Sequence, residues 1–172
     1  MSIRNVMIDL ETYDTVPGGI ILTVGACTFD LRESFYERIS FQDSIQHGFT
    51  ESRDTARWWD KQDVAVKEEA MGGTSGCLDL VVKLADWMAG LEHKSNIRVW
   101  GNGADFDLPI LRAYYDRLGV PLPWGPFSGR CYRTLKDLLP HITPDVKNKT
   151  KHNALEDAIY QARHAVLLLN AL

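Results

Sequence analysis

The stretch Ile3-Arg4-Asn5-Val6-Met7-Ile8-Asp9-Leu10-Glu11 is an apolar run that ends in two acids. Residues 20–29 form a second run, rich in β-branched and small residues, and residues 35–41 alternate loosely between polar and apolar. These patterns predict three strands. Val16-Pro17-Gly18-Gly19 predicts a tight turn between the first two, because glycine tolerates positive φ angles. Since all the connections are short, we expect an antiparallel meander.

Beyond residue 54 the pattern acquires the period of a helix. Asp54 is the expected N-cap of a helix over residues 55–61, and Asp63 that of a second helix over residues 64–71. A third helix is expected to pack on the sheet, because apolar residues recur at spacings of three and four. This apolar stripe consists of Leu78, Val81, Val82, Ala85, Met88 and Ala89.

The second half of the chain continues the alternation. Residues 97–100 are a predicted strand, residues 107–118 a helix that ends at Gly119, and residues 121–129 a loop. A final helix is expected near the C-terminus. Its apolar stripe consists of Leu155, Ala158, Ile159, Ala162, Val166 and Leu169. Strands that alternate with helices in this way predict an α/β fold.

Length and composition favour a single domain over residues 1–172. A chain of 172 residues, of which 45% are hydrophobic, can bury one sizeable core but not two. Neither end has a basic start followed by an apolar stretch, and no apolar run is long enough to cross a bilayer. We therefore expect a soluble, cytoplasmic protein that does not contact membranes.

Charge and cysteine content argue against proteins that coat nucleic acid and against disulfide-linked or zinc-binding proteins. The formal net charge of -4 argues against a protein that coats nucleic acid, which requires an excess of Lys and Arg, so any nucleic acid must be held locally. Cys27, Cys77 and Cys131 are odd in number and far apart. This spacing argues against both a disulfide framework and a zinc site.

Asp9 and Glu11 stand at the end of the first predicted strand. Residues two apart on a strand project from the same face, about 7 Å apart along it, so both carboxylates can reach a hard cation between them. Solvated acids at a strand end are the alternative. On its own, the pair is a weak indication of a metal site.

Trp100-Gly101-Asn102-Gly103-Ala104-Asp105-Phe106-Asp107 leads from a strand through a flexible loop into a helix. The positive end of the helix macrodipole favours acids at this point. If Asp105 and Asp107 both lie in the helix, they point in nearly opposite directions. Only one of them is therefore expected to face the metal site, and the other is expected to cap the helix.

His152-Asn153-Ala154-Leu155-Glu156-Asp157 has the form of a capping box, with Asn153 as N-cap and Glu156 three residues later. This arrangement leaves His152 just outside the helix and fixes Asp157 within its first turns. A fixed carboxylate suits a metal ligand, whereas an imidazole suits a general base that accepts a proton from water. A solvated loop histidine is the alternative for His152.

The order of these residues resembles a known family. Asp9-x-Glu11, then Asn102-x-x-x-Phe106-Asp107, then His152-x-x-x-x-Asp157 is similar to the DEDD superfamily of 3'-to-5' exonucleases, in its histidine-containing DEDDh branch. The resemblance spans nearly the whole chain. It implies a ribonuclease H-like fold, with a mixed central sheet flanked by helices.

Other segments resemble the phage DexA-type exodeoxyribonucleases, the exonuclease VIII nuclease domains and the mycobacterial-type exoribonucleases. They are Asp9-Leu10-Glu11-Thr12, Thr55-Ala56-Arg57-Trp58-Trp59, Trp100-Gly101-Asn102-Gly103 and Arg133-Thr134-Leu135. In that group the motif acid follows the phenylalanine, which selects Asp107 over Asp105. A phage-encoded member would act in the cytoplasm of its host.

The resemblance implies hydrolysis with two Mg²⁺ or Mn²⁺ ions. Asp9 would bridge both ions, and Glu11 and Asp157 would complete the site on the nucleophile side. Asp107 would support the second ion largely through water, and His152 would accept the proton of the attacking water.

The implied substrate is the 3' end of a single-stranded nucleic acid. DNA is the expected substrate, and an exoribonuclease or oligoribonucleotide-processing enzyme of the same chemistry is the alternative. A nucleic-acid-binding module without turnover is a third hypothesis, of another class. The resemblance is also compatible with a homodimer.

Substrate contacts are expected from Thr12, Asn102 and Phe106 by the same resemblance. Trp58 and Trp59 are neighbours about 100 degrees apart on a predicted helix, so one ring can fill the core while the other stacks on a terminal base. Core packing of both rings is the alternative. Three lysines before His152 are expected either to bind the substrate backbone or to form a solvated charge run. They are Lys147, Lys149 and Lys151.

Overall fold

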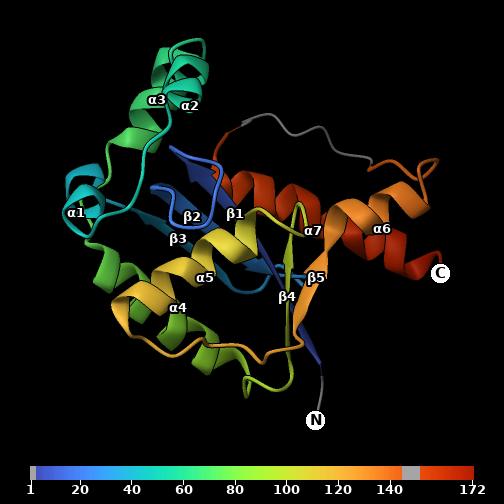
Figure 1. Ribbon diagram of the computed structural model, residues 1–172. Coiled ribbons are helices and arrows are strands. Elements are labelled where there is room, and N and C mark those ends of the chain that lie inside the picture. Colours follow the sequence, from blue (N-terminus) through green and yellow to red (C-terminus); the bar gives the residue numbers. More distant parts are fainter. Residues whose placement is uncertain (1–2, 145–151) are drawn as a thin grey trace.

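The central sheet consists of β1 (Arg4–Thr12), β2 (Ile21–Thr28), β3 (Ser34–Arg38), β4 (Ile97–Gly101) and β5 (Gly129–Cys131). A computed structural model describes residues 3–144 and 152–172 (Figure 1). The strand order is β3-β2-β1-β4-β5. β2 pairs antiparallel with β1 and β3, whereas β4 pairs parallel with β1 and β5. The predicted meander and the mixed sheet are therefore confirmed.

The helices of the described ranges are α1 (Phe41–Gln46), α2 (Arg53–Trp59), α3 (Val64–Met71), α4 (Cys77–Leu91), α5 (Asp107–Leu118), α6 (Tyr132–Leu138) and α7 (Ala154–Asn170). α4 and α5 cover one face of the sheet, and α6 and α7 cover the other. Figure 1 shows α2 and α3 projecting as an arm beyond the sheet. None of these helices is long and apolar enough to cross a membrane.

The alternation of side chains along β1 serves two hydrophobic clusters. Ile8 and Leu10 belong to the cluster that contains residues of α4 and α5, whereas Met7 belongs to the cluster under α6 and α7. Because successive side chains of a strand point to opposite faces, Asp9 and Glu11 share the face of Met7. The acids of β1 are therefore directed towards the α7 side of the sheet.

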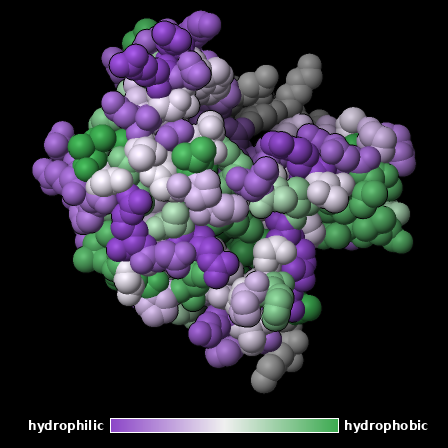
Figure 2. Space-filling view, in the orientation of Figure 1, coloured by the Kyte–Doolittle hydropathy of each residue, from purple (hydrophilic) through white to green (hydrophobic). Residues whose placement is uncertain are grey.

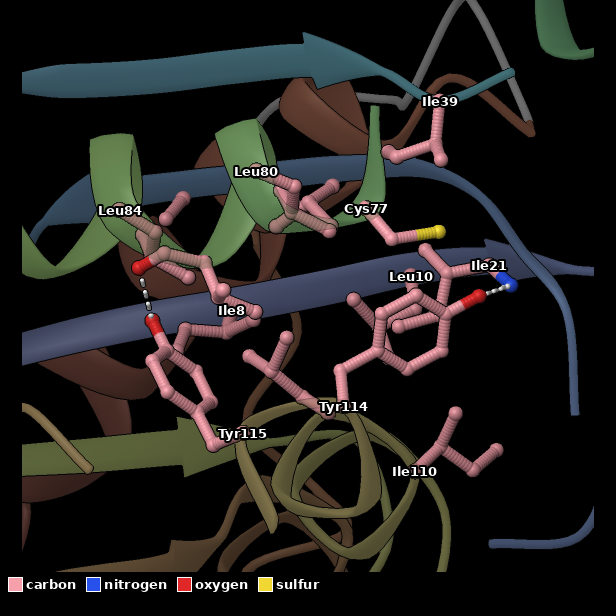
Figure 3. Packing of buried hydrophobic residues seen from close by; sticks show 14 of the residues in the cluster. Ile8, Leu10, Ile21, Ile39, Cys77, Leu80, Leu84, Ile110, Tyr114 and Tyr115 are labelled. Carbon is pink, nitrogen blue, oxygen red and sulfur yellow. Dashed lines mark hydrogen bonds between the residues drawn. The ribbon is translucent and has the colours of Figure 1, made fainter. Parts of the chain in front are cut away.

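Two tyrosines of α5 fix this helix against the sheet and against α4 (Figure 3). The Tyr114 hydroxyl accepts a hydrogen bond from the backbone N–H of Ile21 (2.8 Å), and the Tyr115 hydroxyl donates to the carbonyl of Val81 (3.1 Å). α5 ends at Gly119 in the left-handed conformation (φ 69°), as predicted. Its first residue, Asp107, is thereby held in place beside β1.

The apolar stripe of α4 is rotated relative to the prediction. Leu78 and Val82 are about half exposed. The buried residues are Cys77, Leu80, Val81, Leu84 and Met88. The N–H of Cys77 donates to Asp43 Oδ2 (2.7 Å), which anchors the first turn. Since the sequence carries two overlapping stripes, this long-range contact and the packing of the core decide which one is buried.

α7 differs from its prediction in the same way. Val166 and Leu169 are partly exposed, whereas Ala165 and Leu168 are buried. The N-terminus of the helix is set by Asn153, whose side chain accepts from the N–H of Glu156 (3.1 Å), so the predicted N-cap is confirmed. The rotation that follows turns polar as well as apolar residues of α7 towards the sheet.

Three boundaries also differ from the predictions. Ser52 rather than Asp54 caps α2, because its hydroxyl accepts from the N–H of Thr55 (3.4 Å). Phe41 begins α1 instead of ending a strand, since Ser40 caps that helix. β5 begins at Gly129, the last residue of the expected loop, and α6 follows it directly.

An apolar surface lies over α6 and the C-terminal end of α7, at the right of Figure 2. Leu138 is 67% exposed and Leu172 78% exposed in this region. Contiguous apolar surface is typical of protein interfaces. A homodimer is compatible with the resemblance but is not shown by this surface.

Candidate active site

Asp9, Glu11 and Asp157 lie together where β1 ends and α7 begins. Each offers one carboxylate oxygen, and these oxygens lie within 4.8 Å of one another. Asp9 and Glu11 are only 8% exposed, and Asp157 is partly buried. Carboxylate oxygens in such a group are the ligands that Mg²⁺ and Mn²⁺ prefer.

A glycine of β2 allows α7 to reach β1. Gly25 is paired with Asp9 across the β1–β2 ladder. A Cβ atom at Gly25 would overlap the backbone of Ala154 and Leu155, so only glycine permits this close approach. The first turn of α7 therefore lies directly on the sheet, and Asp157 is carried to the acids of β1.

His152 lies at the edge of the acids, one residue before the N-cap of α7. Its Nδ1 is 3.9 Å from Glu11 Oε1, and its backbone N–H donates to Asp157 Oδ2 (2.9 Å). The ring packs edge-on against Trp58, with the centroids 4.9 Å apart. The residue adopts a left-handed backbone conformation with φ 64°. The three lysines that precede it (Lys147, Lys149 and Lys151) lie outside the described residues.

Asp107 faces the same acids from α5, and it is the least exposed of the four. Its two carboxylate oxygens accept from the backbone N–H groups of Leu10 (3.2 Å) and Asn102 (2.7 Å), and the residue is 1% exposed. Asp105 is exposed and precedes the helix. The expectation that only one of these two acids faces the site therefore agrees with their positions.

Burial and neighbouring carboxylates raise the pKa values of Asp9 and Glu11. Burial, followed by the charges of Asp157 and Asp107, raises the pKa of Glu11 to about 8. Burial and the neighbouring carboxylates also raise the pKa of Asp9 well above its usual range. For Asp107, burial raises the pKa to about 6, although hydrogen bonds from Asn102 and Leu10 oppose the shift. Carboxylates that repel one another in this way fit a site that holds a divalent cation, which would favour their ionised forms.

A cleft of about 960 Å³ opens over the acids. Thr55 and Trp58 of the arm line it together with Ser52, the N-cap of α2. The helices α6 and α7 contribute Tyr132, Lys136 and Tyr160. The expected substrate contacts Thr12, Asn102 and Phe106 also line it. The cleft is therefore large enough for a small ligand or the end of a polymer.

The two adjacent tryptophans have separate places. Trp58 is 40% exposed and lines the cleft. Trp59 is fully buried, and its indole N–H donates to the carbonyl of Thr12 (2.9 Å). The expectation that one ring fills the core while the other is open to the cleft therefore agrees with their positions: Trp59 is the core residue and is removed from the expected substrate contacts, and stacking of Trp58 on a base stays a prediction.

The sequence patterns did not reveal Gln161 or Lys136. Gln161 Nε2 donates to Asp9 Oδ1 (2.6 Å), and Lys136 Nζ lies 5.8 Å from the centre of the Tyr132 ring at the cleft. Gln161 follows Asp157 by four residues, the spacing that places two side chains on one face of a helix. That spacing could have identified Gln161, whereas Lys136 lies on a helix that was not predicted.

A second group with ligand-like atoms has a structural explanation. Asp43, His47 and Cys77 offer atoms within 4.8 Å of one another. The Asp43 carboxylate caps α4, and the Cys77 thiol lies 3.3 Å from the Ser44 hydroxyl. Burial raises the pKa of Cys77 to about 12, which disfavours the thiolate that binds metals.

The mixed five-stranded sheet with flanking helices defines a protein of the ribonuclease H-like fold, and acids from β1, α5 and α7 lie around one cleft of it. The chain belongs to the Rv2179c-like family, because the model of the 3'-5' exoribonuclease Rv2179c-like domain matches residues 4–169. It is accordingly a 3'-to-5' exonuclease. The closer likeness to the DexA-type group stays a prediction.

Solved structures share the fold at low sequence identity. The nuclease domain of 3'hExo, a DEDDh family member bound to rAMP, is 13% identical, with a TM-score of 0.63 over 99% of this chain and 93% of that chain. Exonuclease I of E. coli, in complex with a 5cy-dT13 oligonucleotide, is 14% identical, with a TM-score of 0.67 over 99% of this chain and 41% of that chain. Cell-death related nuclease 4 (CRN-4) is 10% identical, with a TM-score of 0.54 over 99% of this chain and 64% of that chain. No curated protein matches the sequence.

Proposed function

We propose that the chain removes nucleotides from the 3' end of a single-stranded nucleic acid by hydrolysis that depends on two Mg²⁺ or Mn²⁺ ions. The observation that carries this proposal is the group formed by the buried carboxylates of Asp9 and Glu11 and the partly buried one of Asp157, whose oxygens lie within 4.8 Å of one another. Their repulsion is expected to be relieved by divalent cations. When bound, such ions activate a water molecule and stabilise the leaving oxygen of a phosphodiester.

The four acids have unequal roles in this proposal. Asp9 is central, because the charges of the other three acids all act on it, and it is proposed to bridge both ions. Glu11 and Asp157 complete the site on the side of the attacking water. Asp107 is proposed to act on the second ion through water, since backbone N–H groups already bind both of its oxygens.

His152 is proposed to accept the proton of the attacking water. Its Nδ1 lies 3.9 Å from Glu11 Oε1, so the imidazole is beside the acids without lying among them. The bond from its backbone N–H to Asp157 ties the position of the imidazole to that of a metal ligand. A base that is held at the edge of a site in this way can reach a water bound within it.

Substrate is proposed to lie between the two walls of the cleft. The exposed ring of Trp58 offers a stacking surface for a terminal base. Asn102 Oδ1 is buried without a hydrogen-bond partner among the described residues, which supports a role as an acceptor for a substrate donor. Lys136 is the one Lys or Arg in the described lining of the cleft, and we assign it to a substrate phosphate.

The sugar preference has two candidates. The sequence resemblance favours DNA, whereas the description of the matching family model names an exoribonuclease and supports RNA. Single-stranded RNA oligonucleotides are distinguished by 2'-hydroxyl groups, which bind through hydrogen bonds. Both polymers therefore belong in the test.

The test compares matched DNA and RNA oligonucleotides labelled at the 3' or the 5' end, with Mg²⁺ or Mn²⁺. Release of labelled mononucleotide from the 3' label, with stepwise shortening of the 5'-labelled strand, is the expected result. Lack of mononucleotide release from every strand with both metals would contradict the proposal and favour a binding module without turnover.

A further inference from the structure

Gln161 is a buried polar residue in the wall of the cleft. It lies on α7 and is 5% exposed. It follows Asp157 by one helical turn, so both side chains lie on the helix face that meets β1. Its Nε2 donates to Asp9 Oδ1 at 2.6 Å. The same helix therefore supplies a carboxylate to the acid group and an amide to the central acid of that group.

The amide oxygen of Gln161 has no hydrogen-bond partner in the described part of the chain. Gln161 Oε1 is buried and accepts no hydrogen bond from the described residues. An ionised carboxylate can only accept hydrogen bonds, so the bond to ionised Asp9 must come from Nε2, and Oε1 is left as the free acceptor. Buried acceptors are nearly always paired in folded proteins. The free oxygen therefore indicates a donor that the described residues do not provide.

We infer that Gln161 is a positioning residue of the metal centre, in which Nε2 holds the Asp9 carboxylate and Oε1 accepts a hydrogen bond from water in the hydration shell of the cation. This inference rests on the proposed function. A water molecule bound to a divalent cation is a strong donor, and it belongs beside the acids, where the free oxygen lies. Partners of this kind orient the ligands of a metal and raise its affinity.

The alternative is that Gln161 only fills space between α7 and β1. Under that alternative, an apolar side chain of similar size would serve as well, because the shape of the contact is kept. Gln161→Met and Gln161→Leu test this point, since both remove the donor and the acceptor and nearly conserve the volume. Arg163→Ala is the matched control on the exposed face of the same helix.

The experiment titrates Mg²⁺ and Mn²⁺ calorimetrically into the metal-free full chain, without substrate. The two Gln161 variants are expected to bind the ions about 10- to 100-fold more weakly than the unmodified chain, with Arg163→Ala unchanged. In turnover assays, kcat should fall at limiting metal and recover at high metal, whereas KM for the oligonucleotide should change little. A packing role would not produce this dependence on metal concentration.

Circular dichroism identifies which variants are folded, and Asp9→Asn provides the reference for loss of a ligand. If either folded Gln161 variant binds both ions with unchanged affinity, the inference is overturned, and the proposed function still stands provided that Asp9→Asn is inactive. If Asp9→Asn retains full activity, the proposed function itself fails. Loss of folding in both Gln161 variants at every metal concentration would also overturn the inference, because it would make the residue a structural one.

Discussion

Gly25 of β2 lies directly beneath the backbone of Ala154, the first residue of α7. Gly25→Ala should destabilise the protein by more than about 3 kcal/mol, because the new methyl group overlaps a backbone that cannot rotate away. A variant that still folds should lose about 100-fold in turnover, since α7 carries Asp157. Chemical denaturation and oligonucleotide assays measure the two effects.

Gly90 provides the control for this substitution. It lies in α4, and a Cβ atom there would have no other atom within 4 Å. Gly90→Ala should therefore stabilise the protein by about 0.5–1 kcal/mol, through the lower backbone entropy of alanine. Equal effects of the two substitutions would argue against the close approach of α7.

Asp9→Asn should abolish turnover without unfolding the protein. The change keeps the shape of the side chain but removes the charge that the ions require. Turnover should therefore fall by more than about 100-fold, which exceeds the effect of residues that only orient a metal ligand. The exposed Asp105→Asn should behave as the unmodified chain. Full activity in a folded Asp9→Asn protein would remove the basis of the proposed site.

The metal-free protein should become less stable as the pH rises. Folding raises the pKa of Glu11 from 4.5 to about 8, so the folded state holds its proton longer than the unfolded state. The stabilisation from this group is complete below pH 4.5 and is lost as the pH rises through about 8. In the presence of a chelator, the melting temperature of the protein should fall as the pH rises from 4.5 to about 8. Added Mg²⁺ should restore the most stability at the upper end of this pH range.

Glu11→Gln is the control for the pH dependence. It removes the titrating group, so the fall in melting temperature without metal should be smaller than in the unmodified chain. If the melting temperature in the presence of a chelator is constant between pH 4.5 and about 8, Glu11 does not have a raised pKa.

His152→Ala should lower kcat by about 100- to 10,000-fold, the usual contribution of a general base. The affinity for Mg²⁺ should change much less, because the imidazole is not among the three grouped ligands. Calorimetry and single-turnover assays separate the two quantities. A variant with normal kcat would exclude His152 as the base.

Lys136→Gln should weaken substrate binding in a manner that depends on salt. Loss of one phosphate contact should reduce the slope of log affinity against log salt by about 0.7 for a single strand. Lys83→Gln is the matched control, because Lys83 lies on α4 and pairs with Glu37. If both variants have the slope of the unmodified chain, Lys136 does not bind a phosphate.

The sequence was sufficient to predict those helix ends and strand pairs that depend only on residues close together in the chain. Gly119 ends α5 and Asn153 caps α7 as predicted, because each cap involves only residues within one turn. The N-terminal meander could also be predicted, since its strands are joined by short connections. These elements carry all four acids.

Long-range contacts determined what the sequence left open. Periodicity cannot choose between Trp58 and Trp59, and the carbonyl of Thr12 and the core decide that Trp59 is the buried one. The bond from Gln161 to Asp9 joins residues that are 152 positions apart. Such contacts are consequences of the assembled fold, so no local pattern could predict them with the same certainty.

The left-handed backbone of His152 implies a trade-off between stability and activity. Residues other than glycine are disfavoured in this conformation, so the imidazole is kept at an energetic cost. His152→Gly should therefore be more stable than the unmodified chain by up to about 1 kcal/mol, although its kcat should fall as in His152→Ala. Because its backbone can keep the bond to Asp157, this variant is expected to hold substrate without rapid turnover, and added imidazole should restore part of its turnover.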